Sequence, residues 1–207
     1  MAEIRPFRGI RYNIDRIEDM ARVVAPPYDV IDDELQRSLH EAHSHNIVRL
    51  IRGLDEPNDS RTKNRYTRAA DSYGGWQREG VLERDSEEGF YLYNQNFEIA
   101  GPTGPVRKSR LGLVALVKVE AFGEGQVLPH EYTMPAPKAD RLELMRHARA
   151  AFGQIFSLYS DPEGGVRRAV SRHLEAAPLY SFADPEGVTH SFWRITDRST
   201  IDEVRAQ

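Results

Sequence analysis

The order of apolar and polar positions predicts two long strands in the middle of the chain. Aromatic and β-branched residues, which favour strands, dominate Phe90–Ile99 (FYLYNQNFEI) and Leu111–Phe122 (LGLVALVKVEAF). The segment between them, GPTGPVRKS, contains the glycines and prolines of a turn, so we expect the two strands to pair as a hairpin. In the second run, apolar and polar residues do not alternate regularly, which indicates a strand that is buried on both faces.

Shorter apolar runs predict further strands. Asn46–Ile51 (NIVRLI) is apolar and β-branched, which is typical of a buried strand. Ile4–Phe7 and Gln154–Tyr159 are also expected to be strands. Leu179–Phe182 and His190–Ile195 flank the turn sequence ADPEGV and therefore predict a second hairpin.

Helical patterns fill much of the remaining sequence. We expect helices over residues 33–42 and 61–79, from Pro137 to about residue 151, and from Pro162 to about residue 175. Asp32 and Asp161 can cap two of them, and Gly80 can end another. Because strands and helices are mixed and hairpins are frequent, the predicted fold class is α+β. We expect a mixed, largely antiparallel sheet with flanking helices, not a doubly wound sheet, in one domain over residues 1–198.

The last residues predict the start of another helix. Thr200–Glu203 (TIDE) has the capping-box pattern, and few residues follow it. We therefore expect residues 199–207 to begin a helix of a further C-terminal part, and this chain by itself to have little activity. Without that part, we expect an exposed apolar patch or sheet edge that makes a homodimer contact, or else a disordered tail from about Ser199.

Composition excludes several classes of protein. Of the 207 residues, 40% are hydrophobic and 29% are charged, and the net charge of −4 comes without a basic block, which argues against nucleic-acid binding. No apolar run has the length of a membrane span, and the N-terminus lacks the apolar core of a secretion signal. The absence of cysteine excludes disulfides and thiolate chemistry. We expect a soluble, cytoplasmic protein.

The densest polar chemistry lies in Leu128–Arg146 (LPHEYTMPAPKADRLELMR). Three prolines interrupt its first half, which predicts a stiff loop that leads into a helix, and binding residues concentrate on such loops. Glu131 is a candidate general base or metal ligand, and His130 is a candidate acid or hydrogen-bond partner of phosphate. Alternatively, Glu131 caps the helix or pairs with Arg141, and the whole segment is a solvated loop.

Cations near the start of the predicted helix favour an anionic ligand. Lys138 and Arg141 lie where free backbone N–H groups also attract anions. Asp140 between them can cap the helix or orient Arg141 through a bidentate pair, and Thr133 would share a face with Glu131 in an extended segment. Such a group suits a phosphate or a carboxylate; the alternative is a solvated, charged face.

A second stiff segment, VAPPYDV, contains Tyr28 and Asp29. It is either a ligand-facing tip, at which Asp29 binds a hydroxyl, an amine or Mg²⁺, or a turn in which Asp29 caps backbone N–H groups. If both proline-stiffened loops line one cleft, Tyr28 and Asp29 should lie close to Lys138 and Arg141.

Other common motifs are missing from the sequence. It contains no Walker-type phosphate loop, no dinucleotide-binding fingerprint and no serine nucleophile elbow. The run HEYTM departs from the zinc-peptidase motif HExxH, because Met134 stands at the second histidine position. No metal site is predicted.

Four blocks of the sequence resemble the family known as domain of unknown function 1015: IRPFRGIRYN, VAPPYDVI, VLPHEYTMPAPKADRLELMRHARAAFGQIFSLY and PLYSFADPEGVTHSFWRI. They follow the family's order over nearly the whole chain. Members of that family are longer and usually carry an Asp-Gly-His-His-Arg motif just beyond the point at which this chain ends. Because that motif is similar to one in ParB/sulfiredoxin-like phosphotransferases, including free-serine kinases, the resemblance implies phosphoryl transfer, with Mg²⁺ and a nucleotide as candidate cofactors.

Together these observations predict part of an enzyme that handles a small anionic or phosphorylated metabolite. In the scheme that the resemblance implies, Lys138 and Arg141 neutralise a phosphate and His130 hydrogen-bonds it, while Glu131 or Asp29 removes a proton or holds Mg²⁺. The alternative is a non-catalytic binding or protein-interaction module, for which the proline-rich loop is the docking surface.

Overall fold

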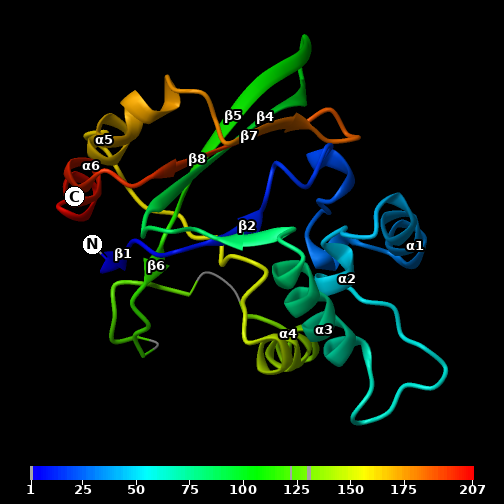
Figure 1. The fold of residues 1–207 in the computed structure, drawn as a ribbon. Helices are drawn as coiled ribbons and strands as arrows, with labels where there is room; N and C mark the ends of the chain where they lie inside the picture. The colour runs from blue at the N-terminus through cyan, green and yellow to red at the C-terminus, as the bar shows by residue number, and fades with distance from the viewer. Residues whose placement is uncertain (1, 122, 130–131) are drawn as a thin grey trace. The chain divides into compact units, whose positions relative to one another are not determined.

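The two predicted hairpins join in one antiparallel sheet. The computed structural model describes residues 2–121, 123–129 and 132–207 of the chain. Within them, the strands β4 (Phe90–Gly101), β5 (Gly104–Val114), β7 (Tyr180–Ala183) and β8 (Thr189–Ile195) form a sheet in the order β5-β4-β8-β7 (Figure 1). Every neighbouring pair in this sheet is antiparallel, with Leu92 opposite Leu113 on one side and opposite Trp193 on the other. The α+β fold class with antiparallel pairing is confirmed.

Four short strands form two smaller ladders. β1 (Ile4–Arg5) pairs antiparallel with β6 (Leu116–Val117). β2 (Ile10–Tyr12) pairs with β3 (Leu82–Arg84).

Some of the helices begin or end where the sequence provides capping groups. They are α1 (Asp33–Ala42), α2 (Val48–Ile51), α3 (Arg65–Arg78), α4 (Pro135–Ala148), α5 (Gly165–Leu174) and α6 (Arg198–Arg205), with 3-10 helices at Met20–Arg22 and Tyr28–Val30. The Asp32 side chain accepts a hydrogen bond from the Leu35 N–H at 2.8 Å, which is the predicted cap of α1. Gly80 follows α3 with φ of 72°, a conformation that glycine adopts without strain.

The chain divides into two compact units. The first consists of Met1–Ile10, Arg84–His130 and Phe156–Gln207, and it contains the four-stranded sheet with α5 and α6. The second consists of Arg11–Glu83 and Glu131–Ile155, and it contains α1 to α4. The prediction of one domain over residues 1–198 stays a prediction.

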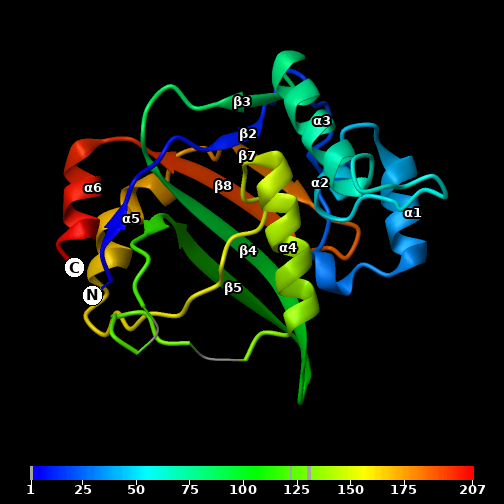
Figure 2. The same cartoon turned by 90° about the horizontal axis from the view of Figure 1, so that it is seen from below.

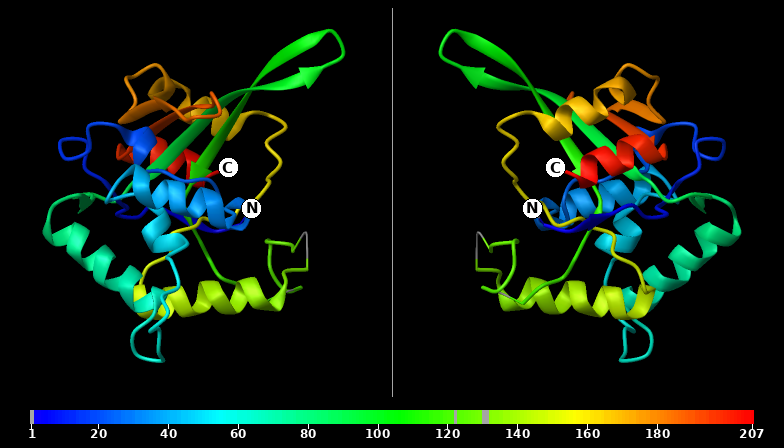
Figure 3. Two further views of the ribbon diagram at one scale, coloured as in Figure 1. Left: turned by 90° about the vertical axis from the view of Figure 1, so that its right-hand side faces the viewer. Right: turned by 90° about the vertical axis from the view of Figure 1, so that its left-hand side faces the viewer.

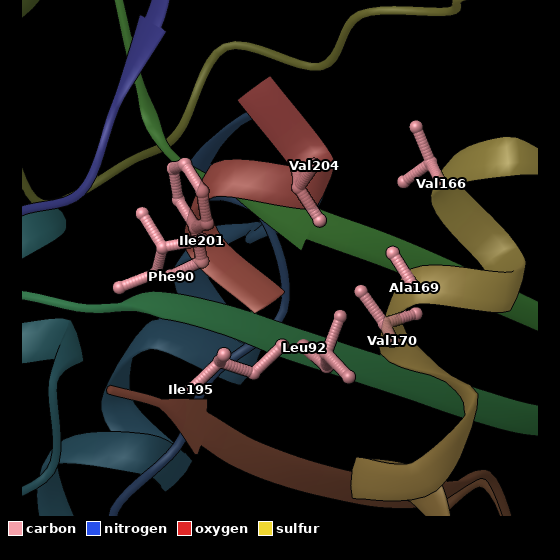
Figure 4. Close-up of a cluster of buried hydrophobic side chains, with 8 residues drawn as sticks. All are labelled: Phe90, Leu92, Val166, Ala169, Val170, Ile195, Ile201 and Val204. Carbon is pink, nitrogen blue, oxygen red and sulfur yellow. The ribbon is translucent and has the colours of Figure 1, made fainter. Parts of the chain in front are cut away.

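In the first unit, α5 and α6 cover one face of the sheet. Their apolar side chains meet those of β4 and β8 in the cluster drawn in Figure 4, which consists of Phe90, Leu92, Val166, Ala169, Val170, Ile195, Ile201 and Val204. Phe90, Leu92 and Ile195 point to this face because side chains alternate along a strand. Their neighbours on β4 and β8 therefore point to the opposite face.

The β4–β5 hairpin extends past the other strands of this sheet. β4 pairs with β8 only over Phe90–Asn96, whereas its pairing with β5 continues to Gly101 opposite Gly104 (Figure 3). The turn is consequently much tighter than the predicted loop GPTGPVRKS, most of which belongs to β5.

In the second unit, α3 and α4 lie side by side (Figure 2). The ring of Tyr66 stacks on that of His147, with centroids 5.8 Å apart, and Tyr73 meets Phe152 edge to face at 5.1 Å. Aromatic pairs of this kind add to the burial of apolar surface. They bring the polar residues of α4 against the first turn of α3.

The predicted strand at Asn46–Ile51 is wrong, because this segment leads into the short helix α2. Asn46 is completely buried and fixes the backbone from its side chain. Its Nδ2 donates to the carbonyls of Arg22 and Val24, and its Oδ1 accepts from the Val48 N–H at 2.9 Å. The segment is buried although it is helical and pairs with no strand. This burial explains why its sequence is as apolar as that of a central strand.

Three other expectations need correction. Leu111–Phe122 is not one buried strand: β5 ends at Val114 and lies at the edge of the sheet, and Leu116 and Val117 of β6 are exposed, while residue 122 lies outside the described residues. Residues 154–159 form no strand. The last helix is capped by Asp197 and not by Thr200, because the Asp197 side chain accepts from the Thr200 N–H at 2.9 Å.

In the part of the chain that the structure describes, we find no helix with the length and apolar character needed to cross a membrane.

We expect Leu92→Ala to lower the free energy of unfolding by about 3 kcal/mol, because it opens a cavity in the sheet–helix core. Leu92 is 1% exposed. Leu158→Ala is the matched control, since Leu158 is 87% exposed and its truncation should change stability by less than about 0.5 kcal/mol. Urea unfolding of the three proteins measures both values, and equal effects would contradict this assignment of the core.

Candidate functional site

The predicted proline-rich loop is helical from its second proline onward. Pro135 is the first residue of α4, and Pro137 lies in the same first turn. Proline is tolerated there because the first N–H groups of a helix have no partner inside the helix. Lys138, Asp140 and Arg141 consequently lie on α4, and Thr133 is exposed just before it. His130 and Glu131 lie outside the described residues.

Asp140 is the centre of a hydrogen-bond network between α3 and α4. Its Oδ1 accepts from Arg65 Nη2 and from the Tyr66 hydroxyl, both at 2.7 Å. Its Oδ2 accepts from Arg141 Nε at 2.9 Å and also from Arg141 Nη2. Since Asp140 is the sixth residue of α4, it orients Arg141 and does not cap the helix. One carboxylate thus binds two guanidinium groups and a phenol.

Arg141 has two more contacts within the second unit. Its Nη2 donates to the Ile51 carbonyl at 2.8 Å, at the end of α2. Its guanidinium carbon lies 4.0 Å from the centroid of the Tyr28 ring, which is a cation–π contact. Arg141 therefore joins α4 to α2 and to the VAPPYDV segment, so the two segments singled out in the sequence meet at Tyr28 and Arg141. The charge of Arg141 is already balanced by Asp140.

The network keeps Asp140 ionised. Burial alone would raise the pKa of the carboxyl group, but hydrogen bonds from Arg141 and Tyr66 and the charges of Arg141 and Arg65 outweigh it, so the pKa is lowered from its ordinary 3.8. Burial raises the pKa of the Tyr66 hydroxyl, and the neighbouring Asp140 adds to this effect. Tyr66 therefore stays a hydrogen-bond donor at neutral pH.

The other predicted site residues on these segments are open to solvent. Lys138 and Asp29 are exposed, and among the described residues no side-chain ion pair or hydrogen bond involves either of them. Asp29 lies in the 3-10 helix Tyr28–Val30. In that same part of the chain, no group of three acidic or histidine side chains is placed to hold a metal ion.

Little space is left around the Asp140 network itself. The cavity lined by Arg65, Asp140, Arg141 and their neighbours has a volume of about 10 Å³, which is roughly the space for one water molecule. Arg141, one of the two cations predicted to bind an anion, is therefore packed within the second unit, whereas Lys138 is exposed.

A larger hollow lies beside this network, on the other side of Arg65. Its volume is about 260 Å³, and it is lined by Asp33, Gln36, Arg37, Arg52, Leu54, Asp55 and Arg65. We call it the arginine hollow. Three of these residues come from one face of α1, because positions three and four apart are neighbours on a helix. The others come from the segment after α2 and from the first residue of α3.

Hydrogen bonds hold the walls of the arginine hollow in place. Gln36 Nε2 donates to the Arg52 carbonyl at 2.7 Å and to the Gly53 carbonyl at 3.2 Å, which fixes α1 to the end of α2. Arg65 Nη1 donates to Asp55 Oδ2 at 3.0 Å, while its Nη2 binds Asp140. Arg65 thus connects the hollow to the Asp140 network.

Two of the arginines that line the hollow have no acidic partner among the described residues. No ion pair there involves Arg37 or Arg52. The Nε of Arg52 is buried and has no hydrogen-bond partner. Sequence reasoning missed both residues, because Arg37 is one of many charges on a helix and Arg52 follows a segment taken for a strand. Only folding brings them to one surface.

The chain belongs to the family described as "Protein of unknown function (DUF1015)", whose model matches residues 4–207. This confirms the resemblance seen in the sequence. No curated protein and no solved structure matches the chain.

We expect Asp140→Asn to lower the free energy of unfolding by about 2 kcal/mol at pH 7, because it removes the charge that two guanidinium groups share. Asp29→Asn is the matched control, since Asp29 is exposed, and should cost less than about 0.5 kcal/mol. Chemical denaturation measures both.

The difference between the parent and Asp140→Asn should also depend on pH. A carboxyl group whose pKa is lowered by folding stabilises the protein above its unfolded value of 3.8, and that stabilisation is lost as the pH falls through the folded value. The difference in the free energy of unfolding between the parent and Asp140→Asn should therefore become smaller below pH 3.8. A gap that stays constant down to acid unfolding would show that Asp140 acts by packing alone.

Proposed function

We propose that this protein binds a small anionic metabolite in the arginine hollow. The observation that carries the proposal is a hollow of about 260 Å³ lined by Arg37 and Arg52, neither of which has an acidic partner among the described residues. Guanidinium groups without an acidic partner can bind the oxygens of an anionic ligand.

The chemistry of the lining supports a phosphate or a carboxylate. Guanidinium groups present their N–H donors in a planar fork that matches the oxygens of both anions. The hollow is slightly smaller than the sites of drug-sized ligands, which are roughly 300–1,000 Å³. A metabolite of a few carbon atoms fits this volume.

The acidic residues of the lining narrow the ligand class. Asp33 and Asp55 line the same hollow as the arginines. Carboxylates disfavour a second anion and favour an ammonium or hydroxyl group. A small zwitterion, such as a phosphorylated amino acid, would match both kinds of side chain.

We further propose phosphoryl transfer as the reaction, with a nucleotide and Mg²⁺ as cofactors. What supports it is a motif that members of the family usually carry outside the part present in this sequence, which is similar to one in ParB/sulfiredoxin-like phosphotransferases, together with the exposed Lys138 and Asp29. In this scheme Lys138 contacts the transferred phosphate and His130 hydrogen-bonds it, while Glu131 or Asp29 removes a proton or holds Mg²⁺.

Calorimetric titration with inorganic phosphate and with phosphoserine tests the binding site. Arg52→Gln should weaken binding of phosphoserine about tenfold or more, because a charged hydrogen bond is lost. Lys108→Gln should leave this affinity unchanged, since Lys108 is an exposed residue of β5 and belongs to the other compact unit. An affinity that Arg52→Gln leaves unchanged, or a flat response to both ligands, would contradict the proposal.

Turnover of Mg²⁺-ATP with serine tests the reaction separately. If the chain transfers phosphate, phosphoserine should form, and Asp29→Asn should lower the rate without changing phosphoserine affinity. Phosphoserine binding without formation of phosphoserine from Mg²⁺-ATP and serine would support the arginine hollow as a binding site, but it would contradict the phosphotransferase assignment.

A second candidate is a protein-interaction module. Large apolar side chains are exposed in two segments of the chain, Leu128, Tyr132 and Met134 in one and Ile155, Phe156, Leu158 and Tyr159 in the other. Exposed apolar surface of this kind is typical of interaction sites. Absence of all ligand binding, together with concentration-dependent sedimentation, would favour this function.

A further inference from the structure

A chain of hydrogen bonds in the first unit joins a tyrosine, a histidine and an aspartate. The Tyr93 hydroxyl lies 2.6 Å from His190 Nδ1, and His190 Nε2 lies 2.9 Å from Asp184 Oδ2. Tyr93 belongs to β4, His190 to β8, and Asp184 follows β7 directly. These residues are separate from the arginine hollow in the sequence and belong to the other compact unit.

The register of the sheet explains why the three side chains meet. Tyr93 is opposite Phe192, and Gln95 is opposite His190, so Tyr93 and His190 are diagonal neighbours on one face. His190 is also opposite Phe182 on β7. This face is the one turned away from the core of Figure 4, because Leu92 and Ile195 point to that core.

Two aromatic rings hold the imidazole in position. Phe182 stacks on His190 with centroids 5.0 Å apart, and Tyr93 lies nearly parallel to it at 5.9 Å. The side chain of His190 is 13% exposed, so its plane and its hydrogen-bond directions are well defined.

Asp184 is fixed independently of His190. Its Oδ1 accepts from the N–H groups of Glu186 and Val188 at 3.0 and 2.9 Å, which closes the turn between β7 and β8. Its Oδ2 is left for His190. Burial opposes ionisation, but the hydrogen bonds from His190 and Val188 outweigh it and lower the pKa of the carboxyl group. Asp184 is thus ionised at neutral pH. It accepts hydrogen bonds from the two N–H groups of the turn and from His190, but it takes no proton from any of them.

This arrangement determines which nitrogen of His190 can act as a base. An ionised Asp184 accepts a hydrogen bond and cannot donate one, so His190 Nε2 carries the hydrogen. His190 Nδ1 is then a free acceptor, and Tyr93 donates to it. A hydroxyl, a base and an orienting carboxylate in this order are the elements of an activated nucleophile.

We propose that Tyr93 is a nucleophilic hydroxyl that accepts an acyl group from an activated ester or amide of a small carboxylic acid. The Tyr93 oxygen bonds to the carbonyl carbon while its proton moves to His190 Nδ1. As the bond to the leaving group breaks, that proton passes from His190 to the leaving group, so that His190 ends neutral. Asp184 stabilises the imidazolium between the two steps.

The surroundings of Tyr93 show why it needs the base. Burial raises the pKa of the Tyr93 hydroxyl, and although the charge of Arg110 lowers it, the net shift is upward. Tyr93 therefore does not ionise by itself at neutral pH. Arg110 lies opposite Gln95 on the same face and is exposed, so it can attract a donor that carries a carboxylate.

Acetylation by N-acetylimidazole, mapped by mass spectrometry on the full chain, tests the proposal. We expect Tyr93 to react faster than Tyr132, although Tyr132 is fully exposed and Tyr93 is half-buried. The acetylation rate of an ordinary phenol increases with its exposure to solvent. Only an activated hydroxyl at Tyr93 would therefore react faster than the more exposed Tyr132. A slower reaction at Tyr93 than at Tyr132 would overturn the proposal.

Asp184→Asn is the variant that separates activation from packing. The amide keeps an oxygen for the turn N–H groups, but its NH₂ group donates to His190 Nε2 and forces the hydrogen onto Nδ1, where it can no longer accept from Tyr93. Labelling of Tyr93 should fall about a hundredfold, with labelling of Tyr132 unchanged.

His190→Gln provides the same test should the Asp184 variant unfold, because it removes the base from an otherwise retained strand. Melting curves establish that each variant is folded. Unchanged labelling of Tyr93 in a folded variant of either kind would show that the three residues only stabilise the β7–β8 hairpin.

Discussion

The shared carboxylate of Asp140 is the interaction on which the second unit depends. It accepts hydrogen bonds from Arg65, Tyr66 and Arg141, and thereby connects α3 with α4. Arg141 extends the connection to the carbonyl of Ile51 at the end of α2, and to the ring of Tyr28. A charge with such partners is favourable inside a protein only when all of its hydrogen-bonding positions are used.

The arginine hollow follows from this constraint. Arg65 points one side of its guanidinium to Asp140 and the other to Asp55, so it forms the wall between the packed network and the open hollow. Arg52 lines both the small cavity and the hollow. The paired arginines hold α2, α3 and α4 together, and the arginines without an acidic partner line the hollow that we propose binds an anion.

The two faces of the sheet in the first unit carry different kinds of side chain. One face is apolar and carries α5 and α6, whereas the opposite face carries Tyr93 and His190. Alternation along β4 and β8 assigns each residue to one face or the other, so a polar chain of hydrogen bonds can form without a cavity in the core. The tight turn at Asp184 then brings a carboxylate to the edge of that second face.

Local signals in the sequence were sufficient for elements that are determined by neighbouring residues. The cap at Asp32, the end of α3 at Gly80 and both hairpins could be predicted, because caps, glycine conformations and strand alternation act over a few positions. The α+β class followed from those elements. Resemblance to a family, carried by four blocks of sequence, was also visible without a structure.

Tertiary contacts decided the rest. Asn46 turns an apolar run into a helix through bonds to backbone carbonyls at Arg22 and Val24, more than twenty positions away. The candidate sites depend on such contacts too: Arg141, one of the two cations predicted to bind an anion, contacts Asp140 and Tyr28, whereas Arg37 and Arg52 have no acidic partner among the described residues. A sequence shows which side chains carry charge, whereas only the folded chain determines which charges are already neutralised, because the partners come from distant segments.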